Sequence, residues 1–222
     1  YQTYTLQRAA ETTRSSLVRL HHARLYVLIN GRPTLEEFRR LAQSLVAAGV
    51  HVLQLRDKRL DDRNLLNRAR VLREVATEGN AIFIMNDRPD LAALSRADGV
   101  HVGQEELCVK DARSIVGTEA LVGVSTHSVH QARQAVLDGA DYIGVGPVFP
   151  SETKQFEQFP GVELVREVAA EIRLPAFAIG GIGLDTLPRV LDAGLRRVAV
   201  GAAISNSSDP AAAVRAFLDA LR

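Results

Sequence analysis

The chain has 222 residues, of which 46% are apolar, so it can bury one sizeable core as a single α/β barrel or as two small domains. Its 27 basic and 26 acidic side chains nearly cancel, which argues against a bulk attraction to nucleic acid or to a membrane surface. Any anion site must therefore be local. The single cysteine, Cys108, cannot form an internal disulfide, and no apolar run of about 18 residues offers a membrane span, so we expect a cytoplasmic protein.

The first 24 residues predict a helical extension ahead of the first strand. Apolar or small residues recur there at the spacing of one helical face, namely Leu6, Ala9, Ala10, Thr13 and Leu17. We expect this helix to pack outside or beneath the first strand.

From residue 25 onward, short apolar runs alternate with amphipathic helical patterns. The runs start about 20 to 35 residues apart, which is typical of successive βα units in a parallel sheet. They are Leu25–Ile29, Val50–Leu55, Ala81–Met85, Gly99–Val102, Ala120–Val124, Tyr142–Val145, Ala176–Ile179 and Arg197–Val200. This pattern predicts the α/β class and a single (β/α)8 TIM barrel over residues 25–222, with an extra N-terminal helix; an open doubly wound sheet is the alternative.

Helix-capping residues support this order of elements. Thr34 and Glu37 form a capping box before an apolar helical pattern, and Gly49 stands where that helix should end. Asp209 and Pro210 fit the cap and first turn of the last helix. Because residues that follow the strands of such a barrel face its active site, we expect the catalytic and binding residues directly after each run.

The second run ends in Gln54-Leu55-Arg56-Asp57-Lys58. Gln54, Arg56 and Lys58 lie two residues apart, so their amide, guanidinium and ammonium groups should point the same way. Such a set suits a polyanion or a hydrogen-bonding heterocycle. The alternative is a solvated strand end with one ion pair to Asp57.

Carboxylates follow the third and fourth runs. Asn86-Asp87 ends the third run, and the fourth run is followed by Gly103-Gln104-Glu105-Glu106. Adjacent strands lie about 5 Å apart, close enough for carboxylates from the two strand ends to share one ion. Oxygen ligands without a nearby Cys or His cluster favour Mg²⁺. The alternative for Asn86-Asp87 is an ordinary turn.

Hydroxyl groups and a histidine follow the fifth run. Ser125 can donate to a phosphate, whereas Ser128 fits a helix cap. His127 can act as an acid or a base or can fill a structural polar position, and the sequence leaves both readings open.

Phosphate-binding candidates follow the last three runs. A long, proline-stiffened connection after the sixth run carries hydroxyls and Lys154, and long loops in compact domains are usually functional. The glycine-rich ends of the seventh and eighth runs, at Gly181 and Gly201, can leave backbone N–H groups for a phosphate cradle. A surface loop and tight turns are the alternatives.

Taken in order, these strand-end segments resemble the thiamine-phosphate synthase family. The resemblance runs from about Leu25 to Arg222, and it rests on six motifs that are weak singly but specific together. They are Gln54-Leu55-Arg56-Asp57-Lys58, Asn86-Asp87, Gly103-Gln104-Glu105, Gly123-Val124-Ser125-Thr126-His127, Gly146-Pro147 through Thr153-Lys154, and Gly180-Gly181-Ile182.

The resemblance implies that a hydroxymethylpyrimidine group is transferred from its diphosphate to the nitrogen of hydroxyethylthiazole phosphate. The products are thiamine phosphate and pyrophosphate, formed by a dissociative, carbocation-like substitution. The residues that it implies for the pyrimidine diphosphate are Gln54, Arg56, Lys58, Asn86, Ser125 and Lys154, with Leu55 and Asp57 in the same binding segment. Those implied for the thiazole phosphate are Ser151, Glu152, Thr153, Gly181, Gly201 and Ala202.

By the same resemblance, Asp87 and Glu106 bind Mg²⁺, and the residues with catalytic roles are Arg56, Lys58, Ser125 and Lys154. Two positions depart from the family pattern: Glu106 stands where Asp is usual, and Ser151 stands where Thr is usual. The extra methylene of Glu106 leaves its direct ligation of the metal open. The expected partners are small-molecule substrates, without nucleic acid or membrane, and self-association into a homo-oligomer stays open.

Two rival functions fit parts of the pattern. A thiazole tautomerase-like barrel would use His127 for proton transfer, and a non-catalytic phosphate-binding regulatory barrel would need only the phosphate cradle. The complete Gln54, Arg56 and Lys58 set and the Asp87 and Glu106 pair argue against both.

Overall fold

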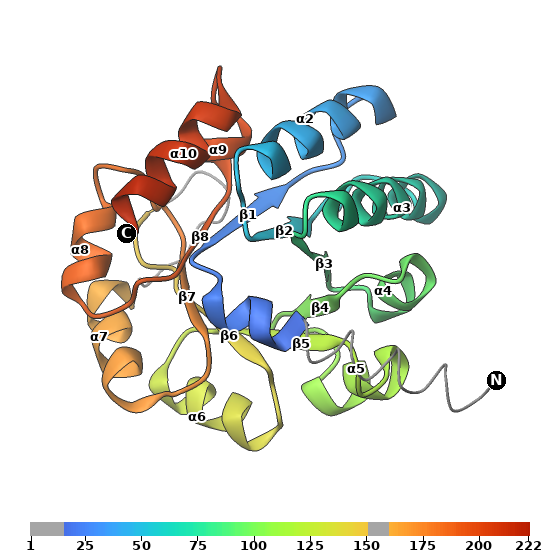
Figure 1. The fold of residues 1–222 in the computed structure, drawn as a ribbon. Coiled ribbons are helices and arrows are strands. Elements are labelled where there is room, and N and C mark those ends of the chain that lie inside the picture. Colours follow the sequence, from blue (N-terminus) through green and yellow to red (C-terminus); the bar gives the residue numbers. More distant parts are fainter. Residues whose placement is uncertain (1–15, 151–159) are drawn as a thin grey trace.

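Parallel strands close into a barrel in a computed structural model that describes residues 16–150 and 160–222 (Figure 1). Each strand pairs with its neighbours in sequence, and β1 also pairs with β8. The strands are β1 (Leu25–Ile29), β2 (Val52–Leu55), β3 (Ile82–Asn86), β4 (Gly99–Val102), β5 (Leu121–Thr126), β6 (Tyr142–Val145), β7 (Ala176–Ile179) and β8 (Val198–Val200). The predicted α/β barrel is confirmed, and the open sheet is excluded.

Helices follow the strands and surround the barrel (Figure 1). They are α2 (Leu35–Ala47), α3 (Asp62–Glu78), α4 (Pro89–Ser95), α5 (Val109–Val116), α6 (Val129–Leu137), α7 (Gly161–Glu171), α8 (Leu187–Asp192), α9 (Ala202–Ser205) and α10 (Pro210–Ala220). The predicted capping box of α2 is confirmed, because the N–H of Glu37 donates to Thr34 Oγ1 and the N–H of Thr34 donates to Glu37 Oε2. Among the described helices, none has the length and apolar character needed to cross a membrane.

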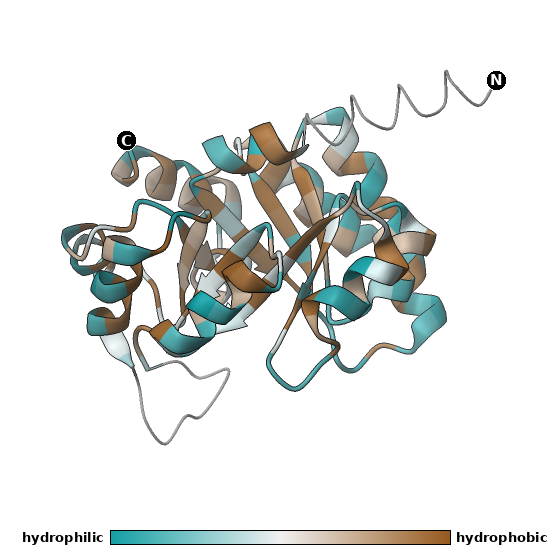
Figure 2. Ribbon diagram, turned by 90° about the horizontal axis from the view of Figure 1, so that it is seen from below, coloured by the Kyte–Doolittle hydropathy of each residue, from teal (hydrophilic) through white to brown (hydrophobic). Residues whose placement is uncertain are grey.

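The strands are buried on both faces. Inward side chains such as Tyr26, Val52 and Phe177 form one cluster inside the barrel, while outward ones such as Val27 and Leu53 pack against the helices. Figure 2 shows the strands as a mainly hydrophobic layer inside helices whose outer faces are hydrophilic. Burial on both faces explains why the strand sequences read as continuous apolar runs.

A short helix over residues 16–22, dark blue ahead of β1 in Figure 1, covers the end of the barrel at which the strands begin. Leu20 and Ala23 are fully buried in the interior cluster, and Arg197 donates to the carbonyl of His21 at 2.8 Å. The N-terminal extension is therefore helical where it is described and packs beneath β1. Its other predicted apolar positions, Leu6, Ala9, Ala10 and Thr13, lie outside the described residues, and the domain boundary at residue 24 stays a prediction.

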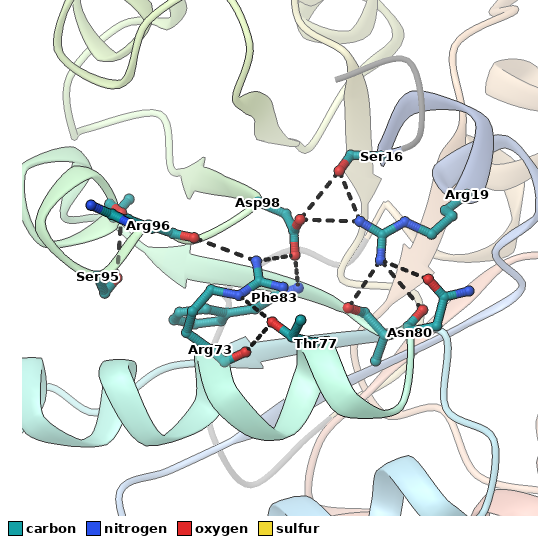
Figure 3. A network of polar contacts seen from close by, with 11 residues as sticks. Ser16, Arg19, Arg73, Thr77, Asn80, Phe83, Ser95, Arg96 and Asp98 are labelled. Carbon is teal, nitrogen blue, oxygen red and sulfur yellow. Dashed lines mark hydrogen bonds and ion pairs between the residues drawn. The ribbon is translucent and has the colours of Figure 1, made fainter. Parts of the chain in front are cut away.

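A buried carboxylate fixes this helix to the barrel (Figure 3). Asp98, whose side chain is 5% exposed, accepts hydrogen bonds from Arg19 at 3.1 Å, from Arg73 at 2.8 Å and from the N–H of Phe83 at 2.8 Å. Ser16 donates to the same carboxylate at 3.2 Å. One aspartate therefore joins the N-terminal helix, α3 and the starts of β3 and β4.

Candidate active site

The carboxyl ends of all strands meet at one mouth of the barrel because the strands are parallel. Gln54 lies two residues after the inward-facing Val52, and Asn86 lies two residues after the inward-facing Ile84. Side chains alternate along a strand, so Gln54 and Asn86 are directed into the same space. The mouth is the place where the predicted polar residues can meet.

Lys58 joins the two carboxylates that were predicted to bind a metal. Its ammonium lies 3.2 Å from Asp87 Oδ2 and 3.6 Å from Glu106 Oε1. Gly103 leaves the space that Glu106 fills, because a Cβ at that glycine would lie 2.2 Å from Glu106 Oε2. The ends of β3 and β4 thus bring Asp87 and Glu106 to one cation.

Asp87 adopts a left-handed backbone conformation, with φ 60°. Few residue types other than glycine tolerate this region, although Asp and Asn do so more readily than most. Its N–H donates to the carbonyl of His101 at 2.8 Å, which holds the end of β3 against β4. A strained residue at a strand end supports a functional assignment.

The segment after β2 divides between two environments. Arg56 is half-buried, and within the described part of the chain no hydrogen bond or ion pair holds its guanidinium. Leu55, in contrast, is 1% exposed and packs in the core between strands and helices. Arg56 is therefore available to an anion, whereas the side chain of Leu55 supports the barrel wall.

Asp57 is also engaged by the protein itself. Its carboxylate accepts the N–H groups of Gly31 at 3.0 Å, Arg59 at 2.9 Å and Leu60 at 3.3 Å. Burial raises the pKa of the Asp57 carboxyl, but these backbone donors outweigh burial and hold the pKa below its ordinary value. The side chain braces the loops after β1 and β2, and its predicted contact with substrate stays a prediction.

A chain of hydrogen bonds inside the barrel links Gln54 to Ser125. Gln54 Nε2 donates to the Tyr26 hydroxyl at 2.7 Å, and that hydroxyl lies 3.2 Å from the Tyr142 hydroxyl. The Tyr142 hydroxyl lies 3.2 Å from His101 Nδ1, and His101 Nε2 lies 3.0 Å from Ser125 Oγ. Two predicted substrate-binding residues on β2 and β5 therefore share one network.

Tyr26, His101 and Tyr142 were not among the site residues predicted from the sequence. Their signal in the sequence is a polar side chain at an inward position of an otherwise apolar strand, as for His101 between Val100 and Val102. Burial raises the pKa of both tyrosines well above the ordinary range, so both hydroxyls keep their protons.

A glycine on β5 makes room for this network. A Cβ at Gly123 would lie 2.1 Å from the Tyr142 ring, so a larger residue would collide with it. Phe177 meets the Tyr142 ring edge-on at a centroid distance of 6.0 Å. The absence of a side chain at Gly123 thus admits the Tyr142 ring from the neighbouring β6.

The ends of β7 and β8 supply space and backbone donors. Gly181 has φ 62°, and a Cβ there would lie 2.4 Å from the carbonyl oxygen of Pro150, so glycine is required where these loops cross. The space around Gly201 is open, and α9 begins at Ala202. The carbonyl of Gly201 accepts the N–H groups of Ile204 and Ser205, whereas those of Ala202 and Ala203 have no acceptor within the helix. The remaining predicted residues of this region lie outside the described residues, namely Ser151, Glu152, Thr153 and Lys154.

His127 follows β5 in the chain, and its ring contacts the segment after β6. Its Nδ1 bonds to the carbonyl oxygen of Gly146, and its N–H donates to Gln131 Oε1 at 2.6 Å. Ser128 accepts the N–H of Gln131 at 3.2 Å and so caps α6, as its position in the sequence predicted. These contacts favour the structural interpretation of His127.

The carboxylate pair fits Mg²⁺. Among the described residues no group of three or more His, Cys, Asp or Glu side chains could enclose a metal ion. Magnesium, however, is usually held by one or two carboxylates, with substrate phosphates and water completing its shell. The Lys58 ammonium between Asp87 and Glu106 shows that this point attracts a cation. The donor set fits a magnesium site that substrate completes, not an all-protein cage.

Comparison with known proteins gives a consistent result. A family model described as thiamine monophosphate synthase matches residues 25–204. Thiamine-phosphate synthase of Rhodopirellula baltica is 45% identical over 92% of this chain and 57% of its own length. The Gloeobacter violaceus enzyme of the same name is 43% identical, with 64% of its length covered, and that of Moorella thermoacetica is 42% identical, with 92% covered.

Solved structures agree with the fold. Thiamine phosphate pyrophosphorylase from Pyrococcus furiosus superposes with a TM-score of 0.79 at 29% identity, covering 89% of this chain and 95% of that one. A 3-hexulose-6-phosphate synthase, at 19% identity and a TM-score of 0.67, shares the fold alone.

The chain spans between about half and two thirds of the length of several curated relatives and nearly all of the length of others. The family match over residues 25–204 and the identities of 42–45% show that the chain belongs to the thiamine monophosphate synthase family.

Proposed function

We propose that this chain joins 4-amino-2-methyl-5-hydroxymethylpyrimidine diphosphate to hydroxyethylthiazole phosphate, giving thiamine phosphate and pyrophosphate. The observation that carries the proposal is the meeting of the Lys58 ammonium with the carboxylates of Asp87 and Glu106 at the barrel mouth. Two carboxylates that share one cation suit a Mg²⁺ ion whose shell a diphosphate completes. Relatives named thiamine-phosphate synthase support the choice of reaction.

The chemical difficulty lies in the leaving group. The bond between the pyrimidine methylene carbon and the diphosphate oxygen breaks, and its electron pair departs with pyrophosphate. The thiazole nitrogen then forms the new bond to that carbon with its lone pair. Negative charge grows on the departing oxygen, and we assign Arg56, Lys58 and Lys154 to its stabilisation, an effect worth several kcal/mol in a preorganised site.

Mg²⁺ held by Asp87 and Glu106 would neutralise diphosphate charge and orient the leaving group. Lys58 would then pair with phosphate oxygens, because a divalent cation held by the two carboxylates would neutralise their charge. Asn86 and Ser125 would add hydrogen bonds to the pyrimidine diphosphate. No covalent nucleophile is needed, and Cys108 instead stands at the start of α5, with its thiol 3.1 Å from Asp111 Oδ2.

The thiazole phosphate would lie at the opposite side of the mouth. The space at Gly201 is open, and the glycine turn at Gly181 and the N–H groups of Ala202 and Ala203 would supply backbone donors to a phosphate. We assign the side chains of the loop after β6 to the same phosphate, namely Ser151, Glu152 and Thr153.

The test is pyrophosphate release by the purified 222-residue chain from both substrates, with Mg²⁺ and with EDTA. Release that requires both substrates and stops with EDTA is the expected result, because the charge on the leaving group must be neutralised. Substrate binding without turnover would contradict the synthase assignment and favour a phosphate-binding module. Conversion of a thiazole phosphate tautomer without pyrophosphate or metal would favour the tautomerase.

A further inference from the structure

Two buried tyrosines and a partly buried histidine have no part in the reaction proposed above. Tyr26 on β1 and Tyr142 on β6 are 2% and 0% exposed, and His101 on β4 lies beside them. Buried hydroxyls are almost always hydrogen-bonded, and these satisfy one another and then reach Gln54 and Ser125. This hydrogen-bond chain thus ends at two side chains, Gln54 and Ser125, that we assign to binding of the pyrimidine substrate.

The Gln54 amide sets the direction in which the hydrogen bonds of this network are donated. Its Nε2 is a donor only, so the Tyr26 hydroxyl accepts from Gln54 and gives its own proton to Tyr142. The Tyr142 hydroxyl then donates to His101 Nδ1. In a neutral imidazole the remaining proton is on Nε2, where it faces Ser125 Oγ.

The two side chains at the ends of this hydrogen-bond chain, Gln54 and Ser125, are consequently fixed as an acceptor and a donor. One N–H of Gln54 Nε2 donates to Tyr26 and so fixes the orientation of the amide, whose carbonyl oxygen is an acceptor for the substrate. With its oxygen accepting from His101, Ser125 offers its hydroxyl proton as a donor. An aminopyrimidine diphosphate carries the complementary groups, since its amine donates and its phosphate oxygens accept.

We propose, on the basis of the synthase function above, that Tyr26, Tyr142 and His101 are positioning residues that fix Gln54 as an acceptor and Ser125 as a donor toward the pyrimidine diphosphate. Packing supports this role, because Phe177 contacts both tyrosine rings and Gly123 leaves room for the ring of Tyr142. Burial raises the pKa of each tyrosine well above its ordinary range, so both remain donors at any pH of assay.

The kinetic test uses Tyr26→Phe and Tyr142→Phe, which remove one oxygen each and keep the rings. Each should lower kcat/KM for the pyrimidine diphosphate about tenfold, the effect of one lost or unsatisfied buried hydrogen bond. KM for the thiazole phosphate should not change. The double variant should lose no more than about twofold beyond either single variant, because members of one network are not additive.

Wild-type kinetics in both single variants, or losses that multiply in the double variant, would overturn the proposal. Phe177→Leu is the matched control, since it alters the packing against both tyrosines and removes no member of the chain. It should retain the wild-type kcat/KM for the pyrimidine diphosphate. An equal loss of kcat/KM in the control would assign the effect to packing and overturn the positioning role.

Nitrogen-15 NMR of the His101 ring, assigned with His101→Asn, tests the chain without substrate. The wild type should show the neutral tautomer protonated at Nε2, and Tyr142→Phe should weaken that preference. A wild-type ring protonated at Nδ1 alone would overturn the direction of the chain. A wild type that releases no pyrophosphate but shows the expected tautomer would overturn the synthase assignment while supporting the hydrogen-bonded chain.

Discussion

Lys58 occupies a position between Asp87 and Glu106 that its place in the sequence only partly indicated. The alternation of Gln54, Arg56 and Lys58 predicted that three polar groups would share one face, and strand adjacency predicted that two carboxylates would meet. The ion pairs at 3.2 Å and 3.6 Å unite these two separate predictions.

Asp87→Asn tests the magnesium assignment. Asparagine tolerates the left-handed conformation at φ 60°, so the backbone should be kept while the charged ligand is lost. We expect the Mg²⁺ concentration for half-maximal pyrophosphate release to rise about tenfold or more, since even indirect partners of metal ligands cost that much. Glu105→Gln, at an exposed neighbouring position, is the control and should titrate like the wild type. Superimposable magnesium titrations of Asp87→Asn and wild type would remove Asp87 from the metal site.

Residues whose hydrogen-bond partners lie on distant strands could not be predicted from the sequence. Tyr26, His101 and Tyr142 lie on three strands, and nothing local to any one of them indicates that the others are within hydrogen-bonding distance. The same holds for Glu106, which reaches Lys58 only because Gly103 leaves space for its side chain. Strand-end motifs can be read locally, whereas the network beneath them depends on barrel closure.

At the scale of elements, the strand predictions succeeded because burial on both faces produces continuous apolar runs. Differences occur at the ends. β2 begins at Val52 and not at Val50, because the N–H of Val50 still bonds to the carbonyl of Leu45 at the end of α2. β5 continues through Thr126, whose hydroxyl donates to the Gly144 carbonyl at 2.9 Å, so the strand extends beyond its apolar run.

Asp57→Asn tests how the loops after β1 and β2 are held together. We expect a loss of about 1 kcal/mol in the free energy of unfolding at neutral pH, because one charge-assisted acceptor is weakened. Since the folded-state pKa of Asp57 lies below its ordinary value of 3.8, its contribution is complete above that value and is lost as pH falls through the folded-state pKa. The wild-type and variant unfolding curves should converge in acid. A difference that stays constant down to acid pH would refute the linkage.

Asp98→Asn tests the junction between the N-terminal helix and the barrel. Removing the charge leaves Arg19 and Arg73 without their common partner, and breaking such a pair is costly when it is largely buried. Urea unfolding should show a loss of about 2 kcal/mol or more. Glu163→Gln is the control, because Glu163 pairs with Arg166 on the surface and should change stability by less than about 1 kcal/mol. Equal effects of the two substitutions would argue against a special role for the Asp98 junction.

At the scale of the whole molecule, helix 16–22 closes one end of the barrel interior, and the proposed active site lies at the other end. Helix 16–22 lies outside the stretch that matches the family model, residues 25–204, yet its Leu20 belongs to the interior cluster. The sequence predicted a helix beneath the first strand but not that it would fill the end of the barrel. That role depends on the positions of Tyr26, Phe177 and other inward residues, which only the closed barrel defines.

Leu20→Ala tests this closure. The side chain is fully buried, so its truncation should lower the free energy of unfolding by about 2 to 4 kcal/mol through lost burial and a residual cavity. Val18→Ala is the matched control on the same helix, because Val18 is 54% exposed and should change stability by less than about 1 kcal/mol. Denaturant midpoints of the two variants provide the comparison. If Leu20→Ala proved as stable as Val18→Ala, the helix would not be part of the core.

The barrel topology, the strand-end motifs and the family membership all point to one mouth of the barrel, where we propose that a diphosphate is separated from carbon. A crystal structure of this chain with Mg²⁺ and pyrophosphate tests that claim most directly. We predict a metal ion between the carboxylates of Asp87 and Glu106, with Lys58 moved from them onto pyrophosphate oxygens. Pyrophosphate bound away from Arg56 and Lys58, or a metal ion that contacts neither carboxylate, would contradict the account.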